Sequence, residues 1–122
     1  MDYEFWFEGR KPMARLDDEQ ALMGRWLSDE IGDDFKHLKA LITTVELLLE
    51  GGLRDYQWQG KETLLQLSRD EAQVSALSVM YDEDLQVLDE QQLELQEFDQ
   101  QAGCGLDDFL DLLLAWKEFI IS

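Results

Sequence analysis

One helical stripe restricts the folds open to this chain more than any other feature. Apolar side chains recur at steps of four, three, four, three and four at Ile31, Phe35, Leu38, Ile42, Val45 and Leu49. This spacing places them along one side of an α-helix. Before the run, Ser28-Asp29 can cap backbone N–H groups, and after it Gly51-Gly52 ends a helix. We therefore expect a long amphipathic helix beginning near Ser28-Asp29, whose apolar side needs a partner surface.

A second stripe closes the chain. The apolar residues at helical spacing here are Leu106, Phe109, Leu113, Trp116 and Ile120. Asp107 and Asp108 suit the first turn of such a helix because carboxylates favour its positive end. We expect Gly103-Cys104-Gly105 to break whatever precedes it. A shorter helix is expected between Asp17 and Leu27, interrupted by Gly24.

Two hairpins are expected from period-two patterns. Tyr3, Phe5 and Phe7 alternate with Glu4, Trp6 and Glu8, which indicates a strand with one buried face. A turn at residues 9–12 lets residues 13–16 return beside it. The runs 63–67 and 72–77 flank a polar turn at 68–71 and predict a second hairpin. Tyr56 and Trp58 are assigned to a connector between the first helix and that hairpin.

These elements follow one another in the order ββαββα. We therefore predict a single α+β domain over residues 1–122, with a four-stranded antiparallel sheet and both amphipathic helices on one face. In this arrangement the stripe that starts at Ile31 packs on the sheet face lined by Tyr3, Phe5 and Phe7. The pattern from Met80 to Ala102 fits neither a helix nor a strand consistently.

The net charge of −18 is unevenly distributed. Residues 1–61 hold eight Lys and Arg against 13 Asp and Glu, a net charge of −5, whereas residues 62–122 hold two against 15, a net charge of −13. No basic residue lies between Arg69 and Lys117. Such a field disfavours direct binding to nucleic acid or membranes and attracts basic proteins. Solubility is the simpler explanation. The densest carboxylates are Asp82, Glu83, Asp84, Asp89, Glu90, Glu94 and Glu97.

Three features lead us to expect a cytoplasmic protein. The first residues carry acids where a signal peptide has positive charge, and no apolar run approaches the roughly 20 residues of a membrane span. The one cysteine, Cys104, has no partner for an internal disulfide.

The same landmarks resemble those of the YacL-type family of small bacterial proteins. They are Met1-Asp2-Tyr3-Glu4-Phe5, Gly24-Arg25-Trp26-Leu27 with Glu30 and Ile31, Trp58 with Gly60 and Glu62, and Cys104-Gly105-Leu106-Asp107-Asp108-Phe109-Leu110. The resemblance extends from end to end of the chain. It implies a small cytosolic bacterial protein, and it transfers no catalytic or binding residue because the family is classed as uncharacterised. The acidic, Gln-rich stretch from Leu88 to Gln101 departs from the family pattern.

Residues that could carry chemistry are few. Zinc needs three or four ligands, and the chain has one Cys and one His. Residues 81–89 lack the glycine of a calcium loop, and no glycine cluster has a phosphate loop's spacing and lysine. We therefore expect no cofactor and no metal. Cys104 is interpreted as a packing residue, and His37 as a surface residue at the edge of its helix.

Trp6 is the aromatic residue that suggests contact with a partner. If the side chains on either side of it face the core, Trp6 points to the open face, where an exposed ring often marks a contact surface.

Three hypotheses on function remain open at this stage. The one we favour is a non-enzymatic module that presents acids to a basic protein or to a basic patch of a larger assembly; a stronger form is mimicry of nucleic acid. The second is a small enzyme with two carboxylates that converge in an apolar cleft. The third is a homodimeric structural subunit that pairs through the open face around Trp6 or through an edge strand.

Overall fold

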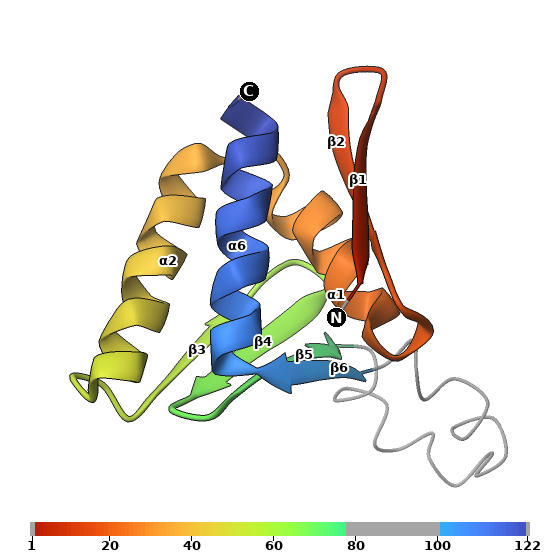
Figure 1. Ribbon diagram of the computed structural model, residues 1–122. Helices are drawn as coiled ribbons and strands as arrows, with labels where there is room; N and C mark the ends of the chain where they lie inside the picture. The colour runs from red at the N-terminus through yellow and green to blue at the C-terminus, as the bar shows by residue number, and fades with distance from the viewer. Residues whose placement is uncertain (1, 78–100, 122) are drawn as a thin grey trace, which may run out of the picture.

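A computed structural model describes residues 2–77 and 101–121 (Figure 1). Four strands pair in antiparallel fashion in the order β3-β4-β5-β6. Their bounds are Asp55–Gln59 for β3, Thr63–Ser68 for β4, Glu71–Ala76 for β5 and Gln101–Gly105 for β6. A separate two-stranded sheet contains β1 (Tyr3–Glu8) and β2 (Lys11–Leu16).

Two long helices cover one face of the four-stranded sheet. In Figure 1, α2 and α6 stand side by side above the sheet, and the hairpin β1–β2 stands on the other side of α6. The helical segments are η1 (Asp18–Gln20), α1 (Ala21–Trp26), the π-helical turn η2 (Leu27–Ile31), α2 (Phe35–Glu50) and α6 (Leu106–Ile121). The predicted α+β class is confirmed, including its four-stranded antiparallel sheet with both amphipathic helices on one face.

The strands that build this sheet differ from those expected. The N-terminal hairpin forms in the register Tyr3↔Leu16 to Glu8↔Lys11, but it pairs with no strand of the larger sheet. The second hairpin, β4–β5, forms where the pattern predicted it. Its outer neighbours are β3, which we had assigned to a connector, and β6, in which Gly103-Cys104-Gly105 continues a strand instead of breaking one.

Tertiary pairing explains both additional strands. In β3 the half-buried Tyr56 and Trp58 alternate with exposed polar residues, a pattern too short to stand out by itself. In β6 the ladder to β5 (Gln73↔Gly103) supplies hydrogen bonds that outweigh the low strand propensity of glycine. The Gln20 amide also donates to the Gly103 carbonyl over 3.1 Å, so part of the edge of β6 is covered.

The first long helix begins later than its stripe predicted. It starts at Phe35, where the Asp34 carboxylate accepts a hydrogen bond from the His37 N–H (3.1 Å). Gly32, with φ of 53°, separates it from η2, to which Ile31 belongs. The buried side is therefore displaced from the expected stripe: Leu49 is 44% exposed, and the buried residues are Leu38, Leu41, Ile42, Val45 and Leu48.

The aromatic face of β1 contacts α6, so its predicted pairing with the stripe of α2 is wrong. The ring of Phe5 meets Trp116 edge-on at 5.0 Å between centroids, and Phe7 stacks on Phe119 at 4.6 Å. Because the hairpin lies outside the main sheet, its ends are not covered. Tyr3 remains 41% exposed and Phe7 51%.

Burial of Leu38 provides a test of this packing. The side chain is completely buried in α2, so Leu38→Ala should lower the free energy of unfolding by about 2 to 5 kcal/mol. Leu49→Ala, in the same helix but exposed, should change it by less than about 0.5 kcal/mol. Urea denaturation of both variants measures the difference, and equal effects would contradict the orientation of α2.

Candidate functional site

The most highly connected carboxylate in the described part of the chain is Glu30, at the end of η2. Its oxygens accept backbone N–H groups from Lys61 (3.1 Å), Glu62 (3.2 Å) and Thr63 (3.2 Å). The Thr63 hydroxyl donates a fourth hydrogen bond at 2.7 Å. Three successive N–H groups that converge on one anion form an anion-binding turn between β3 and β4. Glu30 thereby joins the helical layer to the sheet.

Gly60 gives this carboxylate its space. A Cβ at position 60 would overlap the Glu30 carboxylate, whose oxygens and Cδ are its nearest neighbours. The Gly60 N–H meanwhile bonds to the Thr63 carbonyl at 2.8 Å, which holds the turn closed. An alanine here would displace the carboxylate from its donors.

The hydrogen bonds also control the ionisation of Glu30. Partial burial alone would raise its pKa, but the hydrogen bond from Thr63 and those from the three backbone N–H groups outweigh burial, and the pKa lies below its usual 4.5. The charged form is therefore the one that folding stabilises. Since its acceptor oxygens face these donors, Glu30 is a structural anion and is not positioned as a general base.

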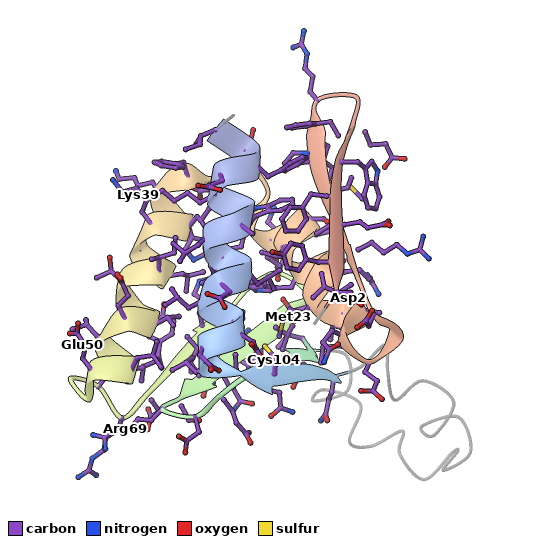
Figure 2. The ribbon with its side chains drawn as sticks, in the orientation of Figure 1. Asp2, Met23, Lys39, Glu50, Arg69 and Cys104 are labelled. Carbon is purple, nitrogen blue, oxygen red and sulfur yellow. The ribbon has the colours of Figure 1, made fainter. Side chains whose placement is uncertain are left out.

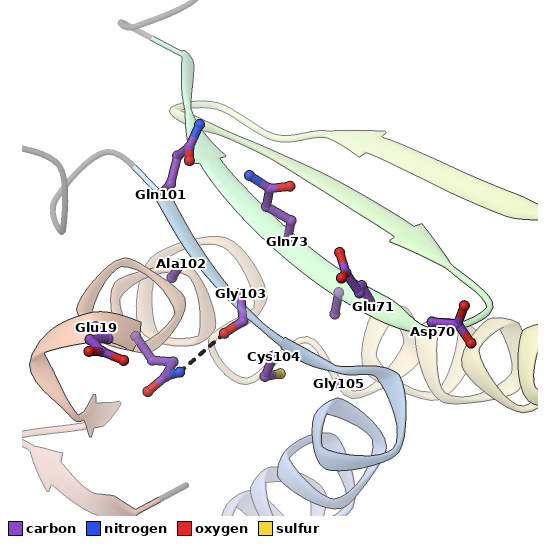
Figure 3. Close-up of a pocket in the computed structure, with 11 residues that line it drawn as sticks. Glu19, Asp70, Glu71, Gln73, Gln101, Ala102, Gly103, Cys104 and Gly105 are labelled. Atoms are coloured by element: carbon purple, nitrogen blue, oxygen red, sulfur yellow. Dashed lines mark hydrogen bonds between the residues drawn. The ribbon is translucent and has the colours of Figure 1, made fainter.

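Cys104 lies at the second feature of interest, an open pocket of about 620 Å³ beside β6 (Figure 3). The pocket is lined by Glu19, Gln20, Asp70, Glu71, Ala72, Gln73, Gln101, Ala102, Gly103, Cys104 and Gly105. Burial raises the pKa of the Cys104 thiol to about 12, and the carboxylates of Asp108 and Asp107 add to the effect. The thiol lies 3.9 Å from the Met23 sulfur; Figure 2 labels both residues. A nucleophilic thiolate is disfavoured in this environment.

His37 and Cys104 are held by different neighbours. The imidazole of His37, half-buried at the start of α2, meets the Trp58 ring edge-on at 4.3 Å. Asp107 and Asp108 are both exposed in the first turn of α6, where the Asp107 carboxylate accepts the Asp108 N–H at 3.0 Å. Within residues 2–77 and 101–121, no three His, Cys, Asp or Glu side chains converge as metal ligands would.

The sequence-predicted interaction residues are described only in part. Trp6 is 38% exposed, on the opposite side of β1 from the rings that contact α6, as expected for a ring on the open face. The acids between Asp82 and Glu97 lie outside the described residues. Sequence reasoning did not identify the Glu30 cluster as a contact: Glu30 and Gly60 were both noted as landmarks, but 30 residues separate them in the chain and no local pattern pairs them.

A family model matches residues 1–120, nearly the entire chain. The chain belongs to the uncharacterised protein family UPF0231. A UPF0231 protein of Shewanella amazonensis is 32% identical over 124 residues, covering 100% of this chain and 98% of the relative. A UPF0231 protein of Vibrio cholerae El Tor is 31% identical over 107 residues, covering 88% and 83%. No solved structure matches the chain. Within the described residues, no helix has both the length and the apolar character needed to cross a membrane.

The landmarks behind the family resemblance come together in this UPF0231 protein. Trp26 is fully buried and contacts Phe109 of α6 at 5.6 Å between centroids. Gly24 lets α1 approach β2, since a Cβ there would be 3.1 Å from the Ala14 carbonyl oxygen. Ser28 completes the junction: its hydroxyl accepts the Ala14 N–H at 2.8 Å and donates to the Gly24 carbonyl at 3.0 Å. These residues position α1 and η2, and with them Glu30.

The Glu30 cluster should make stability depend on pH. Because the pKa of Glu30 is lower in the folded than in the unfolded chain, its contribution is complete above about pH 4.5 and is lost as pH falls through the folded-state pKa. Glu30→Gln presents an amide to the donors and should cost about 1 to 3 kcal/mol near pH 7. The difference from wild type should shrink towards pH 3. Glu62→Gln, which keeps its backbone N–H, is the matched control, and an equal loss in both variants would contradict the cluster.

Alkylation tests the environment of Cys104. At pH 8 a thiol with a pKa of about 12 has few thiolates, so iodoacetamide should modify the folded protein at least about a hundredfold more slowly than the urea-unfolded chain. As the chain has one cysteine, the mass of the adduct reports this site alone. Equal rates in the two states would show that the thiol is exposed.

Proposed function

We propose that this protein is a non-enzymatic interaction module that presents carboxylates to a basic protein or to a basic surface of a larger assembly. The supporting observation is the surplus of unneutralised acid. All 10 Lys and Arg residues lie in the described part of the chain, yet the ion pair recorded there is one, Lys11 Nζ to Asp29 Oδ1 at 2.8 Å. A field of this kind steers cationic partners and repels phosphate and anionic lipid.

The proposed contact surface combines charge with an aromatic ring. Its acids are those between Asp82 and Glu97, where no cation intervenes, and its ring is Trp6 on the outer side of β1. Exposed aromatic rings contribute contact area at little cost in conformational entropy, while the acids set the on-rate. A stronger form of the proposal is that these carboxylates imitate the phosphates of a nucleic acid and so occupy a nucleic-acid-binding surface on the partner.

Homodimerisation is a second candidate, favoured by the separate hairpin. A two-stranded sheet has two edges, and β1 has exposed rings at Tyr3, Trp6 and Phe7. An edge strand of this kind can pair with a copy of itself. Native mass at low and high salt separates the two candidates, because a dimer held by apolar contacts persists in salt.

The proposal includes three narrower points. Within UPF0231 we assign the chain to the YacL type on the landmarks given above, and we place it in the cytoplasm, where basic protein surfaces are abundant. A carboxylate-dependent enzyme is the alternative. It requires two convergent carboxylates, whereas the oxygens of Glu30 face hydrogen-bond donors of the β3–β4 turn.

Salt and neutralisation of the acids should have the same effect on binding. Screening shortens from about 10 Å at 0.1 M to about 3 Å at 1 M, so capture of partners from cell extract should fall steeply over that range. The variant with Asp82, Glu83, Asp84, Asp89 and Glu90 changed to Asn or Gln should capture them poorly even at low salt, mainly through a slower on-rate. Surface plasmon resonance on the recovered partner measures both effects. A partner that binds both proteins equally at all salt concentrations would refute the electrostatic proposal.

A further inference from the structure

An open apolar groove of about 640 Å³ separates β1 from the last turns of α6. Its lining residues are Tyr3 and Phe5 of the strand and Ala115, Glu118, Phe119 and Ile121 of the helix. Ile121 is 59% exposed and Tyr3 41%. Large side chains are therefore held at the surface, where a partner can cover them.

Ring stacking fixes the wall of this groove in advance. Tyr3 stacks on Phe5 with centroids 4.9 Å apart, and Phe5 contacts Phe119 at 5.4 Å and the buried Trp116 at 5.0 Å. Side chains immobilised in the free protein lose little entropy when a ligand binds. The groove is thus preformed for an apolar group.

The charges at the groove are negative. Glu118 is one of its lining residues, whereas the neighbouring Lys117 lies over the Phe35 ring of α2, with its Nζ 5.9 Å from the centroid. The groove therefore has a carboxylate on its wall, while the adjacent cation is engaged with α2.

A second pocket of about 800 Å³ adjoins the groove through Tyr3, which lines both. It has four acids and one cation among its lining residues, which are Asp2, Tyr3, Glu4, Arg15, Leu16, Asp17 and Glu19. The ion pair recorded in the described residues, Lys11–Asp29, involves none of these acids. An apolar site and an anionic site therefore meet at one tyrosine.

We propose that the groove and this acidic pocket together bind one segment of a basic partner, with a bulky apolar side chain in the groove and an adjacent Lys or Arg in the pocket. This inference rests on the proposed function and assigns it a surface. Charge complementarity favours this occupant over the alternatives. Nucleic acid and anionic lipid are repelled by the acids, and a second copy would bring the same acids together across a symmetric interface.

Two exposed apolar residues of α6 provide a matched pair for the test. Ile121 lines the groove, whereas Leu114, 40% exposed in the same helix, does not. The probes are labelled synthetic peptides in which a Leu-Phe pair precedes a Lys-Arg pair, with the spacing between the pairs varied across the set. Fluorescence anisotropy against the full chain gives the affinity, and amide chemical shifts locate the site.

At least one peptide of the set should bind and shift the amide signals of Tyr3, Phe5 and Phe119. Ile121→Gln should weaken that peptide about tenfold, the factor for roughly 1.4 kcal/mol of lost apolar contact, while Leu114→Gln should leave it unchanged. Glu4→Gln with Asp17→Asn should weaken it as salt does. Replacing the Leu-Phe pair of the peptide by Ser should abolish binding.

Several outcomes would overturn the inference. These are no binding by any peptide of the set, equal losses in the two α6 variants, or a doubled native mass that Ile121→Gln abolishes, which would assign the groove to a second copy. Failure here is distinguishable from failure of the proposed function. If captured partners still depend on salt but bind Ile121→Gln as well as wild type, the acidic module stands and the groove is not its binding site.

Discussion

The junction between the helical layer and the sheet depends on one buried-edge anion, the Glu30 carboxylate. Three backbone N–H groups and the Thr63 hydroxyl converge on it, and Gly60 leaves the space that it occupies. Without the charge, the β3–β4 turn would have three donors with no protein acceptor, a cost comparable to the loss of several hydrogen bonds. The position of Glu30 is in turn set by η2, which Ser28 anchors to both α1 and β2.

The second constraint is the separation of the N-terminal hairpin from the main sheet. Once β3 and β6 occupy the outer positions beside β4 and β5, β1 and β2 pack against the helices instead. Phe5 wedges against Trp116, whose indole N–H donates to the Gly32 carbonyl at 2.9 Å, so the hairpin rests on a fixed ring. The same arrangement leaves Tyr3 and Ile121 uncovered and creates the apolar groove. Packing of the hairpin and the proposed binding surface thus have a common origin.

Charge and fold contribute differently to the proposed interaction. The net charge of −18 acts over a Debye length and needs no particular conformation, so it governs encounter with a basic partner. Short-range selection needs fixed apolar side chains, which the stacked rings of β1 and α6 provide. Cys104 and His37, the residues that sequence reasoning tested for nucleophilic chemistry, are instead packed against Met23 and Trp58.

The sequence by itself determined the elements whose signals are local: the alternation in β1, the β4–β5 hairpin, the Gly51 end of α2 and the stripe of α6. It also determined the acidic field, since charge is additive along the chain. Only the tertiary structure decided that β3 and β6 join the sheet, that α2 begins at Phe35, and that Glu30 meets residues 61–63. The reason is physical. Strand pairing and anion binding join groups distant in sequence, and their free energy exists only once both partners are in place.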